Sequence, residues 1–197
     1  MDKKSLRHKY KSLRKALSQE EFQSKQKQVL NNTLQYILAS EAKVIHSFIA
    51  ISKLSELQIE LIFEPLWDAG KTIVVSVSDF KTSSLRHFIL EADTELRESS
   101  FGIKEPVGAK EISASELDLV LVTLLAADIA GNRVGYGKGF YDRFLRDLSP
   151  QAKSIGLSLF DLESDLISDI HPNDIPLNLF INPEGVVNLP INEPLEK

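Results

Sequence analysis

The chain has 197 residues, a formal net charge of −5 and no cysteine, and 43% of its residues are hydrophobic. This length predicts a single domain over residues 1–197, with enough apolar material for a core that needs neither disulfides nor a structural metal. The lack of cysteine excludes thiolate metal sites and a cysteine nucleophile, and the negative charge argues against a general nucleic-acid-binding protein.

The N-terminal segment MDKKSLRHKY is charged and lacks the apolar stretch of a secretory signal. Apolar runs elsewhere stay well short of the roughly 20 residues that a membrane span requires. We therefore expect a cytoplasmic protein with no membrane or nucleic-acid partner, and we expect a monomer.

The first fifteen residues concentrate positive charge on a predicted helix. Apolar residues at helical spacing predict an amphipathic helix over 3–17, with an apolar face of Leu6, Tyr10, Leu13 and Leu17. A neighbouring stripe on this helix is formed by Lys3, Arg7, Lys11 and Arg14. Such a stripe is most often a solvated face, but on an acidic protein it also suits a small anionic ligand.

Helices and strands alternate through the rest of the chain. Ser18 and Glu21 form a capping box that opens a second helix, 19–39, and the capping residues Ser55 and Gln58 predict a third helix that stops at Gly70. Runs rich in apolar and β-branched residues predict strands, with loops between them. The strands are 43–52, 71–78, 85–90, 117–125 and 153–160, and the loops are 98–108 and 171–187, the second of which ends in a short strand.

This alternation predicts an α/β fold with a largely parallel sheet, in which ligands bind beyond the carboxyl ends of the strands. The stretch GNRVGYGKGFYDRFL, 131–145, lies at such an end, between the strand 117–125 and a predicted helix 140–148. The histidines His8, His46 and His87 show no ligand spacing, and we assign them no role.

The glycine-rich stretch has the composition of an anion-binding loop. Alternating glycines let successive backbone amides face one anion, while Lys138 and Arg133 add positive charge. The loop matches neither the Rossmann nor the Walker pattern. Asp142 suits a Mg²⁺ ion that bridges it to a phosphate. Structural alternatives to anion and Mg²⁺ binding are a turn that is glycine-rich for steric reasons and an aspartate that interacts favourably with the helix dipole.

Taken together, these segments resemble the 5-formyltetrahydrofolate cyclo-ligase family, whose members are also called methenyltetrahydrofolate synthetases. The glycine-rich stretch is similar to the family signature G-x-R-x-G-x-G-x-G-[YF]-Y-D-x-[FY]-L. KKSLR resembles the opening K-x-x-x-R element, SFIAISKLSE resembles the segment with a substrate-contacting glutamate, and HPNDIPL resembles a late segment with an aspartate. The resemblance implies a three-layer α/β/α fold with a mostly parallel sheet, akin to the ribose-5-phosphate isomerase and CoA-transferase group.

The resemblance also implies roles for individual residues. Arg133 and Lys138 would be the catalytic cations, and Asp142 and Asp174 would hold Mg²⁺, although Asp174 on its own reads as a turn residue. ATP would be bound by Lys3, Lys4, Ser5, Leu6, Arg7, Arg133, Val134, Gly135, Tyr136, Gly137, Lys138, Gly139, Phe140 and Tyr141. The substrate 5-formyltetrahydrofolate would be bound by Arg7, Ile49, Glu56, Tyr136, Gly137, Lys138, Gly139 and Phe140.

Three positions depart from the family pattern, and all of them bear on the folate side. Thr123 stands where a proline is usual, Ala127 where an aromatic residue is common, and Ile59 where a threonine is frequent. The implied reaction is an ATP- and Mg²⁺-dependent conversion of 5-formyltetrahydrofolate to 5,10-methenyltetrahydrofolate, with ADP and phosphate released. The alternatives are a sugar-phosphate isomerase of related fold and a non-enzymatic nucleotide- or RNA-binding module.

Overall fold

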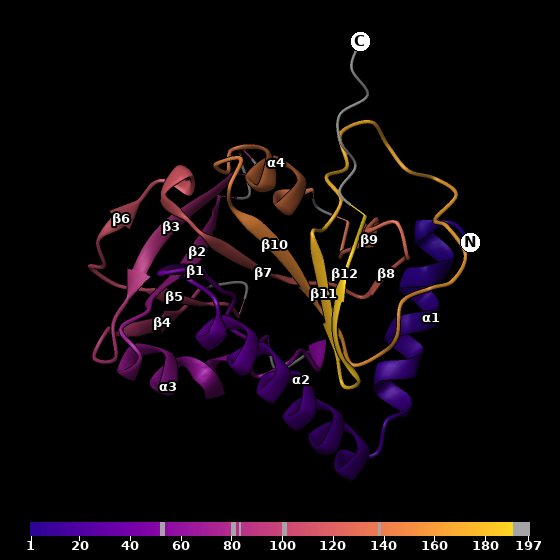
Figure 1. Cartoon of the computed structure of the whole chain (residues 1–197), viewed down its shortest axis with the longest axis horizontal. Coiled ribbons are helices and arrows are strands. Elements are labelled where there is room, and N and C mark those ends of the chain that lie inside the picture. Colours follow the sequence, from indigo (N-terminus) through magenta and orange to yellow (C-terminus); the bar gives the residue numbers. More distant parts are fainter. Residues whose placement is uncertain (52–53, 80–81, 83, 100–101, 138, 191–197) are drawn as a thin grey trace.

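The computed structural model describes residues 1–51, 54–79, 82, 84–99, 102–137 and 139–190, and within these an eight-stranded sheet forms the centre (Figure 1). The strand order is β12-β11-β10-β7-β1-β2-β3-β6. The run from β11 to β2 is parallel, and the pairs toward the two edges are antiparallel. Its strands are β1 (Val44–His46), β2 (Thr72–Asp79), β3 (Ser84–Leu90), β6 (Glu111–Ile112), β7 (Leu119–Thr123), β10 (Lys153–Leu157), β11 (Leu179–Asn182) and β12 (Gly185–Asn188).

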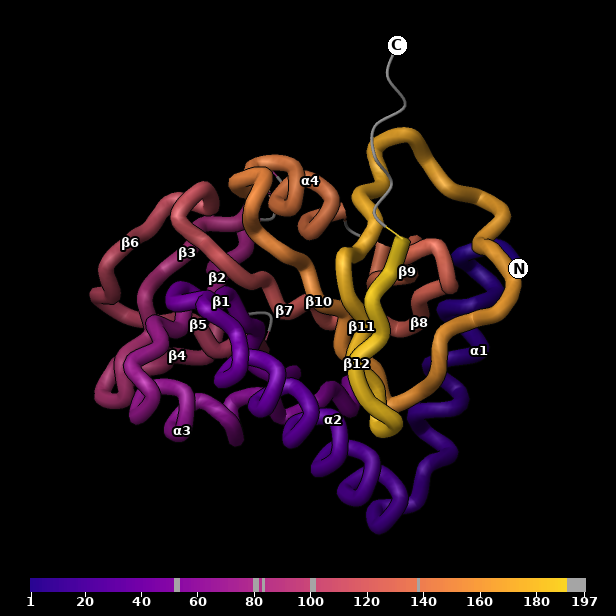
Figure 2. Tube along the Cα trace, in the orientation of Figure 1, coloured from indigo at the N-terminus to yellow at the C-terminus, as the bar shows by residue number. Residues whose placement is uncertain are grey.

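Helices cover both faces of this sheet, as Figure 2 shows. Helices α2 (Gln19–Ala39) and α3 (Phe63–Asp68) pack on one face, and α4 (Phe140–Arg146) packs on the other. Strand β7 illustrates the reason, because Leu121 points into the first core cluster while Val120 and Val122 point into the second. The predicted three-layer α/β/α fold with a mostly parallel sheet is confirmed.

Helix α1 (Lys3–Ala16) packs beside the sheet against the short pair β8 (Ala126–Ala127) and β9 (Arg133–Val134). Its buried residues are Leu6, Tyr10 and Arg14, whereas Leu13 is 39% exposed. The predicted apolar face is therefore wrong at Leu13, because the helix turns the four-residue spacing of Leu6, Tyr10 and Arg14 toward the protein. The predicted capping box of α2 is confirmed, since Ser18 and Glu21 exchange their backbone and side-chain hydrogen bonds.

The segment after β1 differs most from the prediction. The strand ends at His46, and residues 47–51, which were predicted to continue it, belong to no helix or strand. Ser55 does not cap a helix, because it has left-handed backbone geometry with φ of 49°. The predicted long helix begins only at the 3₁₀ turn η2 (Ile59–Ile62), where Gln58 makes no side-chain cap, and continues as α3, whose first turn contains Pro65.

Two other loop predictions were incomplete. The segment 98–108 contributes to a separate two-stranded sheet, in which β4 (Leu96–Glu98) pairs with β5 (Lys104–Pro106). The late segment contains β11 as well as β12, joined as a hairpin, and a 3₁₀ turn η3 (Ala114–Glu116) precedes β7. None of the helices in the described part of the chain is long and apolar enough to span a membrane.

Candidate functional site

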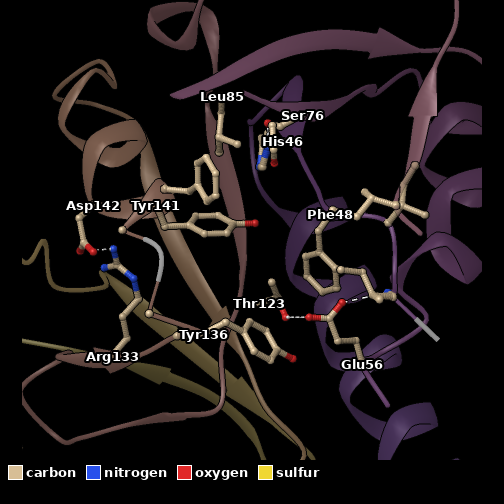
Figure 3. Close-up of a pocket in the computed structure, with 18 of the residues that line it drawn as sticks. His46, Phe48, Glu56, Ser76, Leu85, Thr123, Arg133, Tyr136, Tyr141 and Asp142 are labelled. Atoms are coloured by element: carbon tan, nitrogen blue, oxygen red, sulfur yellow. Dashed lines mark hydrogen bonds and ion pairs between the residues drawn. The ribbon is translucent and has the colours of Figure 1, made fainter. Parts of the chain in front are cut away.

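A cavity of about 390 Å³ opens at the carboxyl ends of β1 and β7, which is the edge where the strand order predicts a ligand (Figure 3). Its walls come from α1, the loop after β1, strand β2, the glycine-rich loop and the start of α4. Among the predicted site residues, the following line it: Lys3, Arg7, Ile49, Glu56, Arg133, Gly135, Tyr136, Gly137, Gly139, Phe140, Tyr141, Asp142 and Asp174.

Four predicted ATP contacts do not line the cavity. Lys4 and Ser5 are exposed on α1, while Leu6 and Val134 are buried in the apolar cluster that joins α1 to β9. Helical geometry explains the three α1 residues, because only one in three or four residues of α1 can face the cavity. Val134 lies on β9, where side chains alternate between the two faces, and its neighbour Arg133 is the residue that lines the cavity. Lys138 lies outside the described residues.

Lys3 and Arg7 of the basic stripe on α1 line the cavity, whereas Lys11 is exposed. The Arg7 Nε donates a 2.9 Å hydrogen bond to the carbonyl oxygen of Gly135, and Lys3 forms an ion pair with Asp174. Lys11 lies with its ammonium 5.9 Å from the ring centroid of Tyr136. The stripe therefore joins α1 to the glycine-rich loop, which supports its interpretation as part of a site.

Arg133 carries positive charge on a side chain that is only 7% exposed. Its guanidinium donates to Asp142 at 2.6 Å and also to the carbonyl oxygen of Ile175. Burial lowers the pKa of Arg133, and the nearby carboxylates of Asp142 and Asp174 oppose that shift. A guanidinium placed in this way can form a planar pair of hydrogen bonds to a phosphate.

Asp142 and Asp174 both line the cavity, and the charges of both act on Arg133. The pKa of Asp174 is lowered: burial raises it, but hydrogen bonds from Lys3 and from the amide of His171 outweigh burial. No group of three or more histidine, aspartate or glutamate side chains suited to a metal occurs among the residues that the structure describes. Two carboxylates fit Mg²⁺ chemically, because this ion usually takes its remaining oxygens from water and phosphates.

Different physical reasons explain why glycine occupies the individual glycine positions of the loop. Gly137 and Gly139 have φ of +90° and +69°, and a Cβ on Gly137 would lie 3.5 Å from the guanidinium carbon of Arg7. Gly131 also has positive φ, but a Cβ there would lie 2.8 Å from the backbone oxygen of Leu177. Close packing therefore explains the glycine at 131, in agreement with the alternative that the turn is glycine-rich for steric reasons. Gly137 and Gly139 instead border the cavity.

The opposite wall of the cavity combines the buried carboxylate of Glu56 with the apolar side chain of Phe48 (Figure 3), and Ile49 also lines the cavity. Glu56 is 5% exposed, and its carboxylate accepts hydrogen bonds from the amide of Ile51 at 2.9 Å and from the hydroxyl of Thr123 at 3.1 Å. This wall can bind a flat apolar group that presents hydrogen-bond donors to Glu56.

Arg14 was missed as a site-supporting residue, because in the sequence it belongs to an ordinary basic stripe. It is 6% exposed and donates hydrogen bonds to the carbonyl oxygen of Leu124 and, at 3.2 Å, to the hydroxyl of Tyr136. Burial raises the pKa of Tyr136, and the negative charge of Glu56 raises it further. Arg14 thereby fixes the ring of Tyr136, which stands in the cavity wall between α1 and Glu56.

Two histidines without a predicted role form a buried array at the cavity wall, where His46 and Ser76 line the cavity and His87 lies outside its lining. His46 Nε2 lies 2.7 Å from Ser76 Oγ, which lies 2.8 Å from His87 Nδ1. Burial lowers the pKa of His87 to about 4 and holds the pKa of His46 well below its usual value. Both rings pack on Phe144 of α4. The spacing of these residues in the sequence does not reveal the group, because its members come from three different strands.

A three-layer α/β protein with cations, carboxylates and an apolar wall around one cavity belongs to the class that binds anionic small molecules at the carboxyl edge of its sheet. The family model described as the 5-formyltetrahydrofolate cyclo-ligase family matches residues 1–167, and the chain belongs to this family. The predicted membership is confirmed, and with it the prediction of an enzyme; the isomerase and binding-module alternatives are not favoured.

Relatives of known name cover most of the chain. A 5-formyltetrahydrofolate cyclo-ligase of Escherichia coli (strain K12) is 28% identical over 177 residues, which cover 88% of this chain and 96% of that protein. The cyclo-ligase of Mus musculus is 27% identical over 151 residues, which cover 73% of each chain.

Solved structures give the same picture. The Aquifex aeolicus 5,10-methenyltetrahydrofolate synthetase superposes with a TM-score of 0.78 at 25% identity, covering 100% of this chain and 97% of that one. A synthetase from Mycoplasma pneumoniae, at 24% identity and a TM-score of 0.76, covers 93% of this chain and 100% of that one, and supports the fold.

Proposed function

We propose that the protein converts 5-formyltetrahydrofolate to 5,10-methenyltetrahydrofolate while ATP becomes ADP and phosphate. The observation that carries the proposal is a single cavity with a cationic side, formed by Lys3, Arg7 and Arg133, facing an apolar side with the buried carboxylate of Glu56. The cationic side suits the ATP phosphates, and the opposite side suits a pterin, whose N–H groups can donate to a carboxylate.

The chemistry requires activation because a formamide oxygen is a poor leaving group. In the proposed reaction the γ-phosphoryl group moves from ATP to the oxygen of the formyl group that is attached to N5. The N10 amine then attacks the formyl carbon and loses its proton to solvent, a C–N bond forms, and the C–O bond breaks as phosphate leaves. The protein contributes positioning and charge neutralisation, for which we propose Arg133 and Lys138, and no side chain needs to act as a nucleophile.

Asp142 and Asp174 would hold the Mg²⁺ ion, which supplies positive charge to the phosphate oxygens. In the structure these carboxylates pair with Arg133 and Lys3. The two cations would exchange their carboxylate partners for phosphate oxygens when ATP and Mg²⁺ bind. That one domain spans residues 1–197, that the protein is a monomer and that it is cytoplasmic stay predictions.

An isotope experiment tests the proposal. Substrate with ¹⁸O in its formyl group should release one labelled phosphate per turnover, while ADP stays unlabelled. Absorbance should rise at longer wavelength, because the methenyl product is a conjugated cation. Both signals should disappear when ATP or Mg²⁺ is left out. Phosphate without label would indicate an unrelated ATPase, and an absorbance change without ATP would indicate simple cyclisation on a binding protein; either result contradicts the proposal.

A further inference from the structure

We infer that Thr123 is a positioning residue for the reduced folate, acting through Glu56, an inference that rests on the proposed function. Thr123 is the last residue of β7, and its hydroxyl donates a 3.1 Å hydrogen bond to Glu56 Oε1. The two residues are 67 positions apart in the chain, and both line the cavity. Thr123 therefore joins the end of a central strand to the carboxylate on the folate side.

Glu56 depends on neutral donors for its orientation. It is 5% exposed, and none of the ion pairs found among the described residues includes it. A buried carboxylate without a cationic partner needs hydrogen bonds to hold it in place. The Ile51 amide supplies one of these at the other oxygen, Oε2.

The Tyr136 hydroxyl also interacts with Glu56, and the two donors Ile51 and Thr123 lie in different parts of the fold. Ile51 and Glu56 lie outside the helices and strands, and Ser55 beside Glu56 has an unfavourable positive φ of 49°. Thr123 instead lies in the sheet, where β7 pairs with β10 in a register that places Thr123 opposite Leu157. Its neighbours Val122 and Leu124 are fully buried. The Thr123 hydroxyl is therefore the fixed reference for the carboxylate, and the bond is strengthened by the charge of its acceptor.

Replacing the hydroxyl should weaken folate binding and leave ATP binding unchanged. Thr123→Val keeps the β-branched shape and removes the donor, whereas Thr123→Ser keeps the donor. We expect Thr123→Val to lower the affinity for 5-formyltetrahydrofolate about tenfold or more, as for loss of a hydrogen bond to a charged group. Thr123→Ser should restore most of it. Thr72→Val, at the opposite end of the sheet and outside the cavity, is the matched control and should bind as the wild type does.

Calorimetric titration of 5-formyltetrahydrofolate and, separately, of ATP into each folded variant measures these effects. Steady-state kinetics should show a raised KM for the folate with an unchanged KM for ATP. In a Glu56→Ala background, Thr123→Val should have little further effect, because the acceptor is already gone. The inference is overturned if Thr123→Val binds folate as the wild type does. It is also overturned if Thr123→Val loses as much affinity in the Glu56→Ala background as in the wild type. Either result leaves the proposed function standing. A wild-type protein that binds ATP but no 5-formyltetrahydrofolate contradicts the proposed function itself.

Discussion

Arg133 and Lys3 bring positive charge into the cavity, and each is neutralised by a carboxylate that the proposed reaction needs for Mg²⁺. The two pairs differ in how firmly the cation is held. Arg133 also donates to the Ile175 carbonyl oxygen and its side chain is 7% exposed, whereas Lys3 has a flexible stem that can carry its ammonium into water. Each of these two cations of the site is thus paired with a carboxylate of the same site.

Asp142→Asn and Asp174→Asn should differ in stability and act together on Mg²⁺. Asp142→Asn leaves the Arg133 cation with less compensation, so the free energy of unfolding should fall by about 1–3 kcal/mol, between the values for exposed and buried pairs. Asp174→Asn should cost less, about 1 kcal/mol or below. Urea unfolding measures both.

Each of these variants should also need more Mg²⁺ for half-maximal activity. If the two carboxylates hold one ion, the double variant should lose less activity than the product of the single losses predicts. Strict additivity with an unchanged Mg²⁺ requirement would show that these residues do not share a metal.

At the scale of elements, the glycine-rich loop is where the chain turns from strand to helix while contacting two other segments. Arg7 of α1 bonds to the carbonyl of Gly135, and Leu177 of the late segment donates its amide to the carbonyl of Gly131. The loop is therefore positioned by residues more than 40 positions away, and its glycines divide into those that allow packing and those that border the cavity.

Gly131→Ala and Gly135→Ala should separate these two roles. The Gly131 site has φ of +84° and no room for a methyl group, so alanine should lower the free energy of unfolding by about 2 kcal/mol or more. A Cβ on Gly135 would meet no atom within 4 Å, and this variant should fold within about 0.5 kcal/mol of the wild type. If ATP phosphates lie against Gly135, its affinity for ATP should still fall about tenfold. Thermal unfolding measures the stability of the two variants, and ATP titration measures their affinity for ATP. If Gly135→Ala binds ATP as tightly as the wild type does, the phosphates do not lie against Gly135.

Across the whole molecule, the sequence predicts what local patterns determine. The capping box at Ser18, the alternation of strands and helices and the family signature follow from neighbours within a few positions, and they led to the correct fold class and family. Contacts between distant segments were not predictable in this way. Thr123 stood out only as a departure from a usual proline, and its partner lies 67 positions earlier. Arg14 looked like one more surface cation until the fold placed Leu124 and Tyr136 beside it.

The buried histidine array makes the stability of the whole molecule depend on pH. Burial lowers the pKa of His87 to about 4, opposed weakly by Asp147 and Glu111, and burial with the nearby His87 holds the pKa of His46 well below its usual value. Below about pH 6.5 the unfolded chain binds protons that the folded protein does not. The contribution is therefore complete above about 6.5 and is lost progressively as the pH falls toward 4.

Urea unfolding between pH 6.5 and 5.5 tests this dependence, because the carboxylates of both the folded and the unfolded chain stay mostly ionised in this window. Each histidine should add a slope of about 1.4 kcal/mol per pH unit toward the acid end of this window. His87→Asn keeps a polar atom near Ser76 but cannot titrate, so it should remove about half of the slope contributed by the pair. His8→Asn is the matched control, because His8 is exposed on α1, and it should leave the slope unchanged. If the free energy of unfolding changes with pH equally in the wild type and in His87→Asn, His87 is charged in the folded protein. That result would contradict the interpretation that the buried histidines are neutral.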